Sequence, residues 1–120
     1  MNSSSSVEAT PVEVAAAAAT FAALGDPVRL GILAVLADGT HCVCDIQERV
    51  PLAANLLSYH LRVLREAGLI ASARRGRWID YRWDERAAQV LTGALSVTGI
   101  RAAVEVPLVA QLPIVDECPR

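Results

Sequence analysis

Hydrophobic positions recur with the period of an α-helix along most of the chain and alternate with polar positions in one short stretch. The helical period predicts helices over residues 11–24, 27–38, 44–50, 53–67 and 85–97. The alternating stretch predicts strands over 69–74 and 78–83, with a turn between them that contains Arg75, Gly76 and Arg77. The predicted order is four helices, a β-hairpin and a last helix.

Residues that favour helix ends support these boundaries. Thr10 can cap the first helix, and Glu13 completes a capping box. Gly25 ends this helix, and the pair Asp26-Pro27 starts the next one. We expect the second helix to bury an apolar stripe made of Leu30, Ile32, Leu33 and Leu36.

Two short helices with a tight joint, followed by a hairpin with a basic tip, are typical of a winged helix-turn-helix. The predicted fold class is therefore mainly α (α+β), in the order ααααββα. A content of 53% hydrophobic but only 4% aromatic residues favours helices packed through small side chains. We expect a disordered tail over 1–9, the winged helix-turn-helix domain over 10–98, and a C-terminal tail with Cys118 over 99–120.

Basic charge is concentrated in one part of a chain that is acidic as a whole. The net charge is −2, yet six arginines fall between Arg62 and Arg82, among 11 basic residues in total. A local basic segment on a mildly acidic protein is compatible with a surface that binds a polyanion.

The helix over 53–67 has an apolar face of Leu57, Leu61 and Leu64 opposite a face of hydrogen-bonding side chains. Such groups suit base edges and phosphates. We predict DNA contacts from Asn55, Ser58, Tyr59 and Arg62 on this helix, and from Arg74, Arg75 and Arg77 at the hairpin tip. His60 is expected to be half-buried and hydrogen-bonded locally or to a phosphate. Two or three of Trp78, Tyr81 and Trp83 are expected to pack the hairpin.

The three cysteines are an odd number and include a C-x-C pair: Cys42, Cys44 and Cys118. This pattern argues against a disulfide framework and for a reduced compartment. No apolar run reaches the roughly 20 residues of a membrane span, and the first residues lack the pattern of a secretory signal. We therefore expect a cytoplasmic protein without a membrane partner.

Four blocks of sequence, in order, resemble the ArsR/SmtB family of metal-sensing repressors. They are Leu24–Leu30, Cys42–Ile46, Leu57–Leu69 and Gly76–Tyr81, and together they span about residues 20–90. The resemblance implies a homodimer whose interface is formed by the first and last helices. It also implies repression of a metal-resistance operon through an imperfect palindrome of operator DNA, with recognition helices about 34 Å apart.

Cys42 and Cys44 match the thiolate site of this family. In its arsenic-sensing members a third cysteine follows three residues later, where this chain has Gln47. We predict Cys42, Cys44 and Cys118 as ligands, with the tail folding back onto its own subunit or the partner. Soft thiolates select As(III), Sb(III), Hg(II), Cd(II) or Cu(I) as the inducing ion. His41 is an alternative donor that would shift the preference toward zinc or cadmium.

The spacing of the two cysteines also predicts a release mechanism. Residues two apart on a helix point about 200° apart, so two helical cysteines cannot hold one ion. We therefore expect ion binding to unwind or re-aim residues 42–44 and to disturb the recognition helix packed on them. A shift from 99:1 bound to 1:99 needs ~5.5 kcal/mol, which metal–thiolate bonds can supply.

The same residues bear on three other possible functions. A thiol-redox-sensing repressor would use oxidation of Cys42, Cys44 or Cys118 on the same fold. A protein-interaction module would show DNA affinity that does not depend on Arg62 or Arg77. An enzyme is disfavoured because the sequence shows no Ser/His/Asp set, phosphate loop or paired carboxylates. We predict a non-enzyme.

Overall fold

The computed structural model describes residues 9–100. In chain order its elements are α1 (Pro11–Leu24), α2 (Pro27–Val35), the 3-10 helix η2 (Leu36–Asp38), β1 (His41–Cys42), α3 (Val43–Arg49), α4 (Ala54–Glu66), β2 (Ile70–Arg75), β3 (Trp78–Trp83) and α5 (Ala87–Ser96). The three strands form one antiparallel sheet in the order β1-β3-β2. The predicted fold class, mainly α with a hairpin before the last helix, is confirmed.

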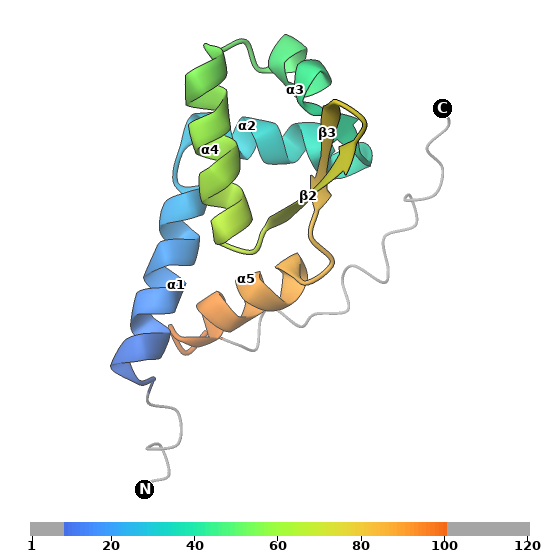
Figure 1. The fold of residues 1–120 in the computed structure, drawn as a ribbon. Helices are drawn as coiled ribbons and strands as arrows, with labels where there is room; N and C mark the ends of the chain where they lie inside the picture. The colour runs from blue at the N-terminus through green and yellow to red at the C-terminus, as the bar shows by residue number, and fades with distance from the viewer. Residues whose placement is uncertain (1–8, 101–120) are drawn as a thin grey trace, which may run out of the picture.

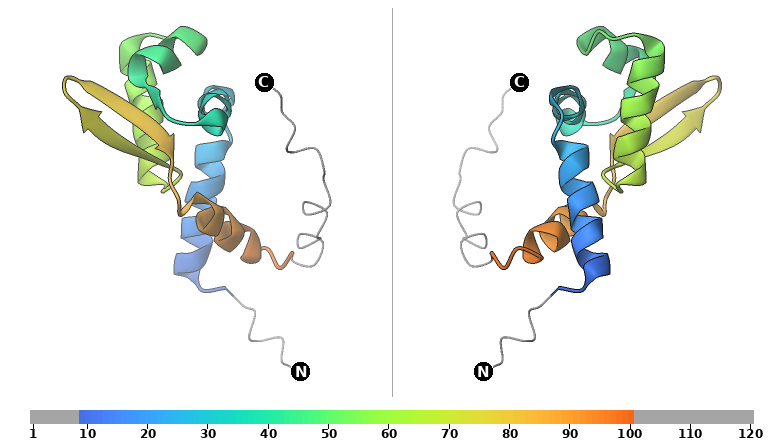
Figure 2. Two further views of the ribbon diagram at one scale, coloured as in Figure 1. Left: turned by 90° about the vertical axis from the view of Figure 1, so that its right-hand side faces the viewer. Right: turned by 90° about the vertical axis from the view of Figure 1, so that its left-hand side faces the viewer.

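The helices divide into two groups (Figure 1). α1 and α5 pack against each other at one end of the molecule, and α2, α3 and α4 lie toward the other. The β2–β3 hairpin projects from the body as a wing (Figure 2). Within residues 9–100 no single helix is long and apolar enough to cross a membrane. Two helical segments, Pro11–Leu24 and Pro27–Asp38, are long and apolar enough when they are taken together, but the chain bends by 79° between them.

The predicted starts of the first two helices are confirmed by their hydrogen bonds. The Thr10 hydroxyl accepts from the Glu13 amide at 3.1 Å, and the Glu13 carboxylate accepts from the Thr10 amide at 3.0 Å. Asp26 Oδ2 accepts from the amides of Val28 and Arg29 at 2.9 and 3.1 Å. These caps satisfy amides that a helix leaves without partners, which is why the boundaries are readable from the sequence.

The core is built from the inner faces of α2, α3, α4 and the sheet. Its fully buried large side chains are Ile32, Leu36, Ile46, Leu57, Leu61, Leu64, Leu69 and Ile70. The predicted apolar face of α4 is therefore confirmed. Because this face is held by the core, the opposite face of α4 is presented to solvent in a fixed orientation.

Two expectations were wrong, one for Leu30 and one for the start of the last helix. Tyr81 is buried and Trp83 half-buried, so two of the three hairpin aromatics pack as expected, while Trp78 is 45% exposed. Leu30 is 52% exposed instead of lying in the α2 stripe, because it precedes Ile32 by two residues and so points about 200° away. The last helix begins two residues late because Asp84 first forms a turn, accepting from the Arg86 amide at 2.8 Å.

The strand β1 was not predicted. His41 and Cys42 pair with Tyr81 and Asp80 of β3, which adds a third strand to the wing. Two residues are too few to show alternation, and their partner lies about 40 positions further along the chain. This strand matters for function because it takes Cys42 out of the helix that follows it.

Candidate nucleic-acid interface and thiol site

α4 presents the predicted polar face to solvent. Asn55, Ser58 and Arg62 are exposed, and Tyr59 is 45% exposed. One apolar side chain missed by the sequence reasoning lies beside them: Leu56, which is 47% exposed. An exposed leucine suits contact with a thymine methyl group. The sequence signal that could have identified Leu56 was its position next to Asn55, outside the apolar stripe that the helix buries.

Arg29 and His60 hold α4 against the end of α1. The Arg29 guanidinium donates to the carbonyls of Ala23 and Ala22 at 2.8 and 3.1 Å, and to His60 Nδ1 at 3.0 Å. Since arginine only donates, Nδ1 of His60 is the acceptor in this hydrogen bond. His60 is thus a half-buried residue with a local partner, and Arg29 is a positioning residue that the sequence reasoning missed.

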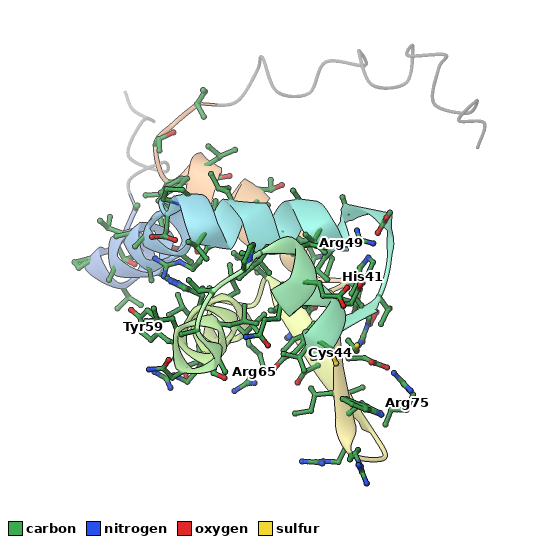
Figure 3. All side chains as sticks on the ribbon, turned by 90° about the horizontal axis from the view of Figure 1, so that it is seen from above. His41, Cys44, Arg49, Tyr59, Arg65 and Arg75 are labelled. Atoms are coloured by element: carbon green, nitrogen blue, oxygen red, sulfur yellow. The ribbon has the colours of Figure 1, made fainter. Side chains whose placement is uncertain are left out.

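Tyr59 orders two neighbours on the exposed face of α4. Its ring meets the His60 ring edge-on, with centroids 5.1 Å apart, and the Arg62 guanidinium lies 5.6 Å from its centroid. Figure 3 shows Tyr59 and Arg65 on α4, apart from the wing. A cation held over an aromatic face loses less conformational freedom when it binds a phosphate. Arg62 is therefore preorganised for an anionic partner.

The wing tip carries exposed cations around a tight turn. Gly76 has φ +65°, a left-handed conformation that suits glycine, and it lets β2 reverse directly into β3. Arg74 and Arg77 are exposed on either side of it, and Trp78 is exposed at the start of β3. The tip thus offers two guanidinium groups and one indole to a partner.

Arg75 differs from the other arginines of the wing. Its guanidinium donates two hydrogen bonds to the Asp80 carboxylate, from Nε at 2.8 Å and from Nη2 at 3.0 Å. The Arg75 partner lowers the pKa of Asp80. The structure therefore places Arg75 in an ion pair within the hairpin, with two of its donors on Asp80, while its side chain stays 63% exposed.

Cys42 and Cys44 form a thiol pair where β1 meets α3. Cys42 is extended, with φ −78° and ψ 160°, and caps α3, whereas Cys44 is in its first turn. The Asp45 amide and then the neighbouring Cys44 thiol lower the pKa of Cys42. The amide approach falls short of a well-formed capping hydrogen bond. The same contact between the thiols raises the pKa of Cys44.

This geometry corrects the predicted release mechanism. We expected residues 42–44 to be helical, so that the two side chains pointed apart and an ion had to unwind the helix. Cys42 is instead extended and held in a strand by its pairing with Asp80, and only Cys44 lies within α3. Binding of one ion by both cysteines therefore does not require a turn of α3 to unwind.

Comparisons with known proteins identify the family. A model described as "Bacterial regulatory protein, arsR family" matches residues 26–72. An uncharacterized HTH-type transcriptional regulator of Methanocaldococcus jannaschii is 38% identical over 77 residues, which are 62% of this chain and 86% of the relative. The solved ArsR-like transcriptional regulator from Rhodococcus sp. RHA1 is 30% identical, covers 85% of this chain and 92% of its own, and has a TM-score of 0.65.

The chain belongs to the ArsR family. It is a DNA-binding transcriptional regulator with a winged helix-turn-helix, and the prediction of a non-enzyme is confirmed by this membership. The arsenical resistance operon repressor of Escherichia coli is 40% identical over 63 residues. That match spans 52% of this chain and only 54% of the relative.

Gln47 occupies the position of the third cysteine in the arsenic-sensing pattern. Its side-chain amide donates to the Leu52 carbonyl at 2.9 Å. The bond ties α3 to the segment that leads into α4, so Gln47 holds the joint of the helix-turn-helix.

His41, the alternative donor, has both ring nitrogens engaged. Nε2 lies 2.7 Å from Asp38 Oδ1, and Nδ1 contacts Asp45 Oδ2. Asp38 and then Asp45 raise the pKa of His41. The ring would have to leave one carboxylate to bind an ion. Its arrangement instead links η2 to α3 and steadies the short strand that carries Cys42.

The described residues supply two sulfur donors. Among residues 9–100 no group of three His, Cys, Asp or Glu side chains is arranged to hold a metal ion. The third predicted ligand, Cys118, lies outside the described residues. The thiol pair alone fits a linear or partly solvated site for a thiophilic ion, and a trigonal site would need a further sulfur.

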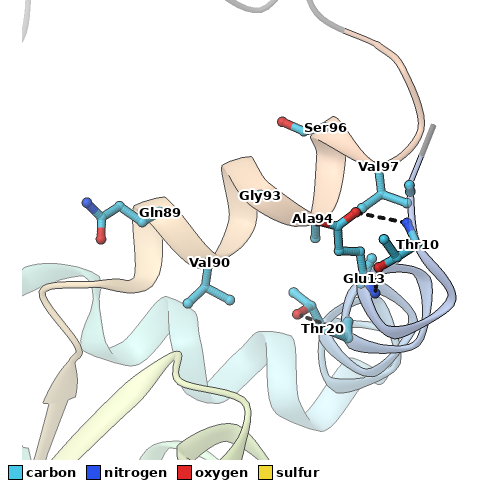
Figure 4. A pocket seen from close by; sticks show the side chains of 12 residues that line it. Thr10, Glu13, Thr20, Gln89, Val90, Gly93, Ala94, Ser96 and Val97 are labelled. Atoms are coloured by element: carbon cyan, nitrogen blue, oxygen red, sulfur yellow. Dashed lines mark hydrogen bonds between the residues drawn. The ribbon is translucent and has the colours of Figure 1, made fainter. Parts of the chain in front are cut away.

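α1 and α5 enclose a groove of about 600 Å³ between them (Figure 4). Glu13 and Thr20 of α1, with the N-cap Thr10, face Val90, Gly93 and Ala94 of α5 across it. The outer surface of α1 is apolar as well, with Val12 77%, Val14 49% and Phe21 39% exposed. These two helices therefore carry much of the apolar surface that the described part of the chain leaves uncovered.

Proposed function

We propose that the protein is a metal-responsive repressor that binds operator DNA as a homodimer and leaves it when a thiophilic ion binds cysteine thiolates. The inducing ion would be As(III), Sb(III), Hg(II) or Cd(II), and its effect the derepression of a metal-resistance operon. The observation that carries this proposal is the Cys42–Cys44 thiol pair at the start of the helix-turn-helix. A DNA-bound repressor of this kind would act in the cytoplasm.

The proposed binding of DNA rests on two surfaces. Asn55, Ser58, Tyr59 and Arg62 form the exposed face of α4, which we assign to the major groove. Arg74 and Arg77 at the wing tip are assigned to phosphates or to the minor groove, with Trp78 beside them. His60 joins this surface through its free Nε2 side, because Arg29 occupies Nδ1.

The proposed homodimer rests on the exposed apolar surface of α1 and α5. α1 buries Ala17, Thr20 and Ala23 within the subunit and leaves Val12, Val14 and Phe21 to solvent. We propose that a second copy covers this surface. Two-fold symmetry would then place two α4 helices about one turn of DNA apart, which is the spacing of a palindromic operator.

The proposed response to a thiophilic ion rests on the chemistry of the thiol pair and on the names of similar repressors. Repressors named for arsenical resistance in Escherichia coli and Bacillus subtilis are 40% and 42% identical over 63 and 62 residues, and a homologue named as a SmtB repressor is 38% identical. Two adjacent thiols that release their protons bind soft ions in preference to hard ones. We retain Cys118 as a proposed third ligand.

Release of DNA is the experiment that tests this function. An operator duplex selected from random-sequence DNA would be titrated with As(III), Hg(II) and Cd(II) in the presence of wild type, Cys42→Ser/Cys44→Ser and Cys118→Ser. We expect thiolate-to-metal absorption and DNA release in wild type and neither in the double variant. A normal response of Cys118→Ser would reduce the site to two sulfurs, and DNA release from the double variant would refute the thiol site.

A thiol-redox repressor is a second candidate, favoured by the opposite pKa shifts of the two cysteines. Peroxide would take two electrons from the pair, the two thiol protons would leave, and a disulfide would form as peroxide is reduced to water. Release of DNA by peroxide without any ion, reversed by dithiothreitol, would support this function. Release by one ion per site without oxidation supports metal sensing.

A further inference from the structure

Cys42, Asp80 and Arg75 lie on one face of the three-stranded sheet. Cys42 is the Cα partner of Asp80, and Asp80 is the partner of Ala73 on β2, two residues before Arg75. Partners in adjacent strands point to the same side, as do residues two apart in a strand. The other face of the sheet carries Tyr81, which is buried in the core.

The Arg75–Asp80 pair fixes the tip of the wing to β3. Its two hydrogen bonds, at 2.8 and 3.0 Å, hold a planar guanidinium in one orientation on a carboxylate that is only 19% exposed. Arg75 is the last residue of β2, directly before the turn at Gly76. The pair therefore links the strand partner of Cys42 to the residues that form the tip.

The thiol pair is close enough to act on Arg75 electrostatically. Asp80, followed by the negative charge of Cys42 and Cys44, raises the pKa of the Arg75 guanidinium. Figure 3 labels Cys44 on α3 and Arg75 further out on the wing. The pairing of Cys42 with Asp80, and the hydrogen bonds of Asp80 with Arg75, connect the thiol site to the residue that anchors the wing tip.

We propose that the Arg75–Asp80 ion pair is the positioning element through which occupancy of the thiol site reaches the wing. An ion that draws the two thiolates together displaces β1, Asp80 follows its strand partner, and the ion pair carries the tip away from its DNA-bound position. Arg75 is then a coupling residue and not a DNA contact. This inference rests on the proposed function. It adds a second route from the thiol site to the DNA-binding surface, besides the contact of α3 with α4.

Asp80→Asn and Arg75→Gln test the inference, with Asp84→Asn as a matched control. Asp84 is also paired with an arginine of its own segment, Arg86, but it lies at the base of the wing, away from Cys42. DNA affinity would be measured by fluorescence anisotropy with and without Hg(II), and Hg(II) uptake by thiolate absorption. Both test variants should take up Hg(II) as wild type does, yet the factor by which Hg(II) weakens DNA binding should fall roughly fivefold.

The affinity without Hg(II) separates coupling from DNA contact. Asp80→Asn frees a guanidinium, so its ligand-free DNA affinity should equal or exceed that of wild type. Arg75→Gln should keep the salt dependence of wild type. A fall of about 0.9 in the slope of log K against log salt for Arg75→Gln would make Arg75 a phosphate contact. That result, or Hg(II) release unchanged in both variants, would overturn the inference.

A readout without DNA keeps this test apart from the proposed function. If Hg(II) fails to release wild type, the proposed function fails, but Trp78 fluorescence in a Trp83→Phe background still reports on the wing. We expect Hg(II) or N-ethylmaleimide at the thiols to change Trp78 emission in the parent protein and not in Asp80→Asn. Equal changes in both would show that the ion pair carries no signal.

Discussion

Three arginines of this chain have three different roles. Arg62 is exposed and rests over Tyr59, ready for an external anion. Arg29 donates hydrogen bonds to two carbonyls and to His60, all within the subunit. Arg75 is committed to Asp80. A count of positive charges cannot tell these roles apart, because hydrogen-bond partners far along the chain decide which guanidinium is free to meet DNA.

Arg62→Ala should weaken operator binding and reduce its dependence on salt. The loss of one phosphate contact lowers the slope of log K against log salt by about 0.9. Anisotropy titrations over a series of salt concentrations measure this slope. Arg86→Ala is the control, since Arg86 is exposed at the N-cap of α5, outside α4 and the wing. Equal slopes for wild type and Arg62→Ala would remove Arg62 from the interface.

Asp84 should contribute stability that depends on pH. Hydrogen bonds from the Arg86 side chain and amide lower the pKa of Asp84 from 3.8 to about 2. A carboxyl whose pKa is lower in the folded state stabilises the protein above about pH 4, and this contribution is lost as pH falls from about 4 to 2. Urea unfolding should show Asp84→Asn less stable than wild type at neutral pH.

The difference between the two proteins should shrink toward pH 2, where wild-type Asp84 is protonated as well. Asparagine keeps the turn-forming oxygen, so the variant isolates the charge. Glu85→Gln serves as the control for a neighbouring exposed carboxylate. A difference that is constant with pH would show that the charge of Asp84 does not stabilise the fold.

At the scale of elements, local signals predicted what local interactions determine. The starts of α1 and α2 follow from Thr10 and Asp26, whose side chains cap amides within three residues. The burial of α4 follows from the period of its leucines. β1 was missed because its pairing with β3 is long-range and only two residues long. That one omission made the predicted cysteine geometry wrong.

The candidate site shows the same division between local and long-range signals. The residue types of the α4 face and the C-x-C pair were readable from spacing, and the α4 face is exposed as expected. The engagement of Arg29 with His60 and of Arg75 with Asp80 was not, because each bond depends on how two elements pack. A sequence names candidate groups, whereas tertiary packing decides which of them stay available.

Leu61→Ala should destabilise the domain far more than Leu56→Ala, although both lie on α4. Leu61 is 1% exposed within the core, and Leu56 is 47% exposed. A buried leucine truncated to alanine costs about 2–5 kcal/mol, whereas a surface change stays within about 0.5 kcal/mol. Chemical denaturation measures both. Comparable losses would mean that Leu56 is covered, for example by a partner subunit.

At the scale of the whole molecule, α1 and α5 stand apart from the half that carries α4 and the wing (Figure 1). The exposed apolar residues of α1 gain from burial only if another surface covers them. Two copies joined there would hold two α4 helices at a fixed separation. Affinity for a palindrome then depends on both half-sites being engaged together.

Phe21→Glu should therefore convert the proposed dimer to a monomer. A charge at a side chain that is 39% exposed on α1 would be desolvated in the proposed interface. Operator affinity should fall roughly a hundredfold with the loss of bivalent binding. Sedimentation velocity and anisotropy measure the two effects. Leu30→Glu, at an exposed leucine of α2, is the control; a Phe21→Glu protein that stays dimeric would place the interface elsewhere.

The hydrogen bonds of Arg29 have a consequence for which operators the protein accepts. They fasten the last turn of the proposed dimer helix to His60 on α4, so the angle between the two α4 helices is set inside each subunit. One extra base pair between half-sites rotates one of them by roughly 35° around the DNA axis. Wild type should reject such an operator, and Arg29→Ala should discriminate less between spacings. Half-site phasing is then read by a side chain that need not touch DNA.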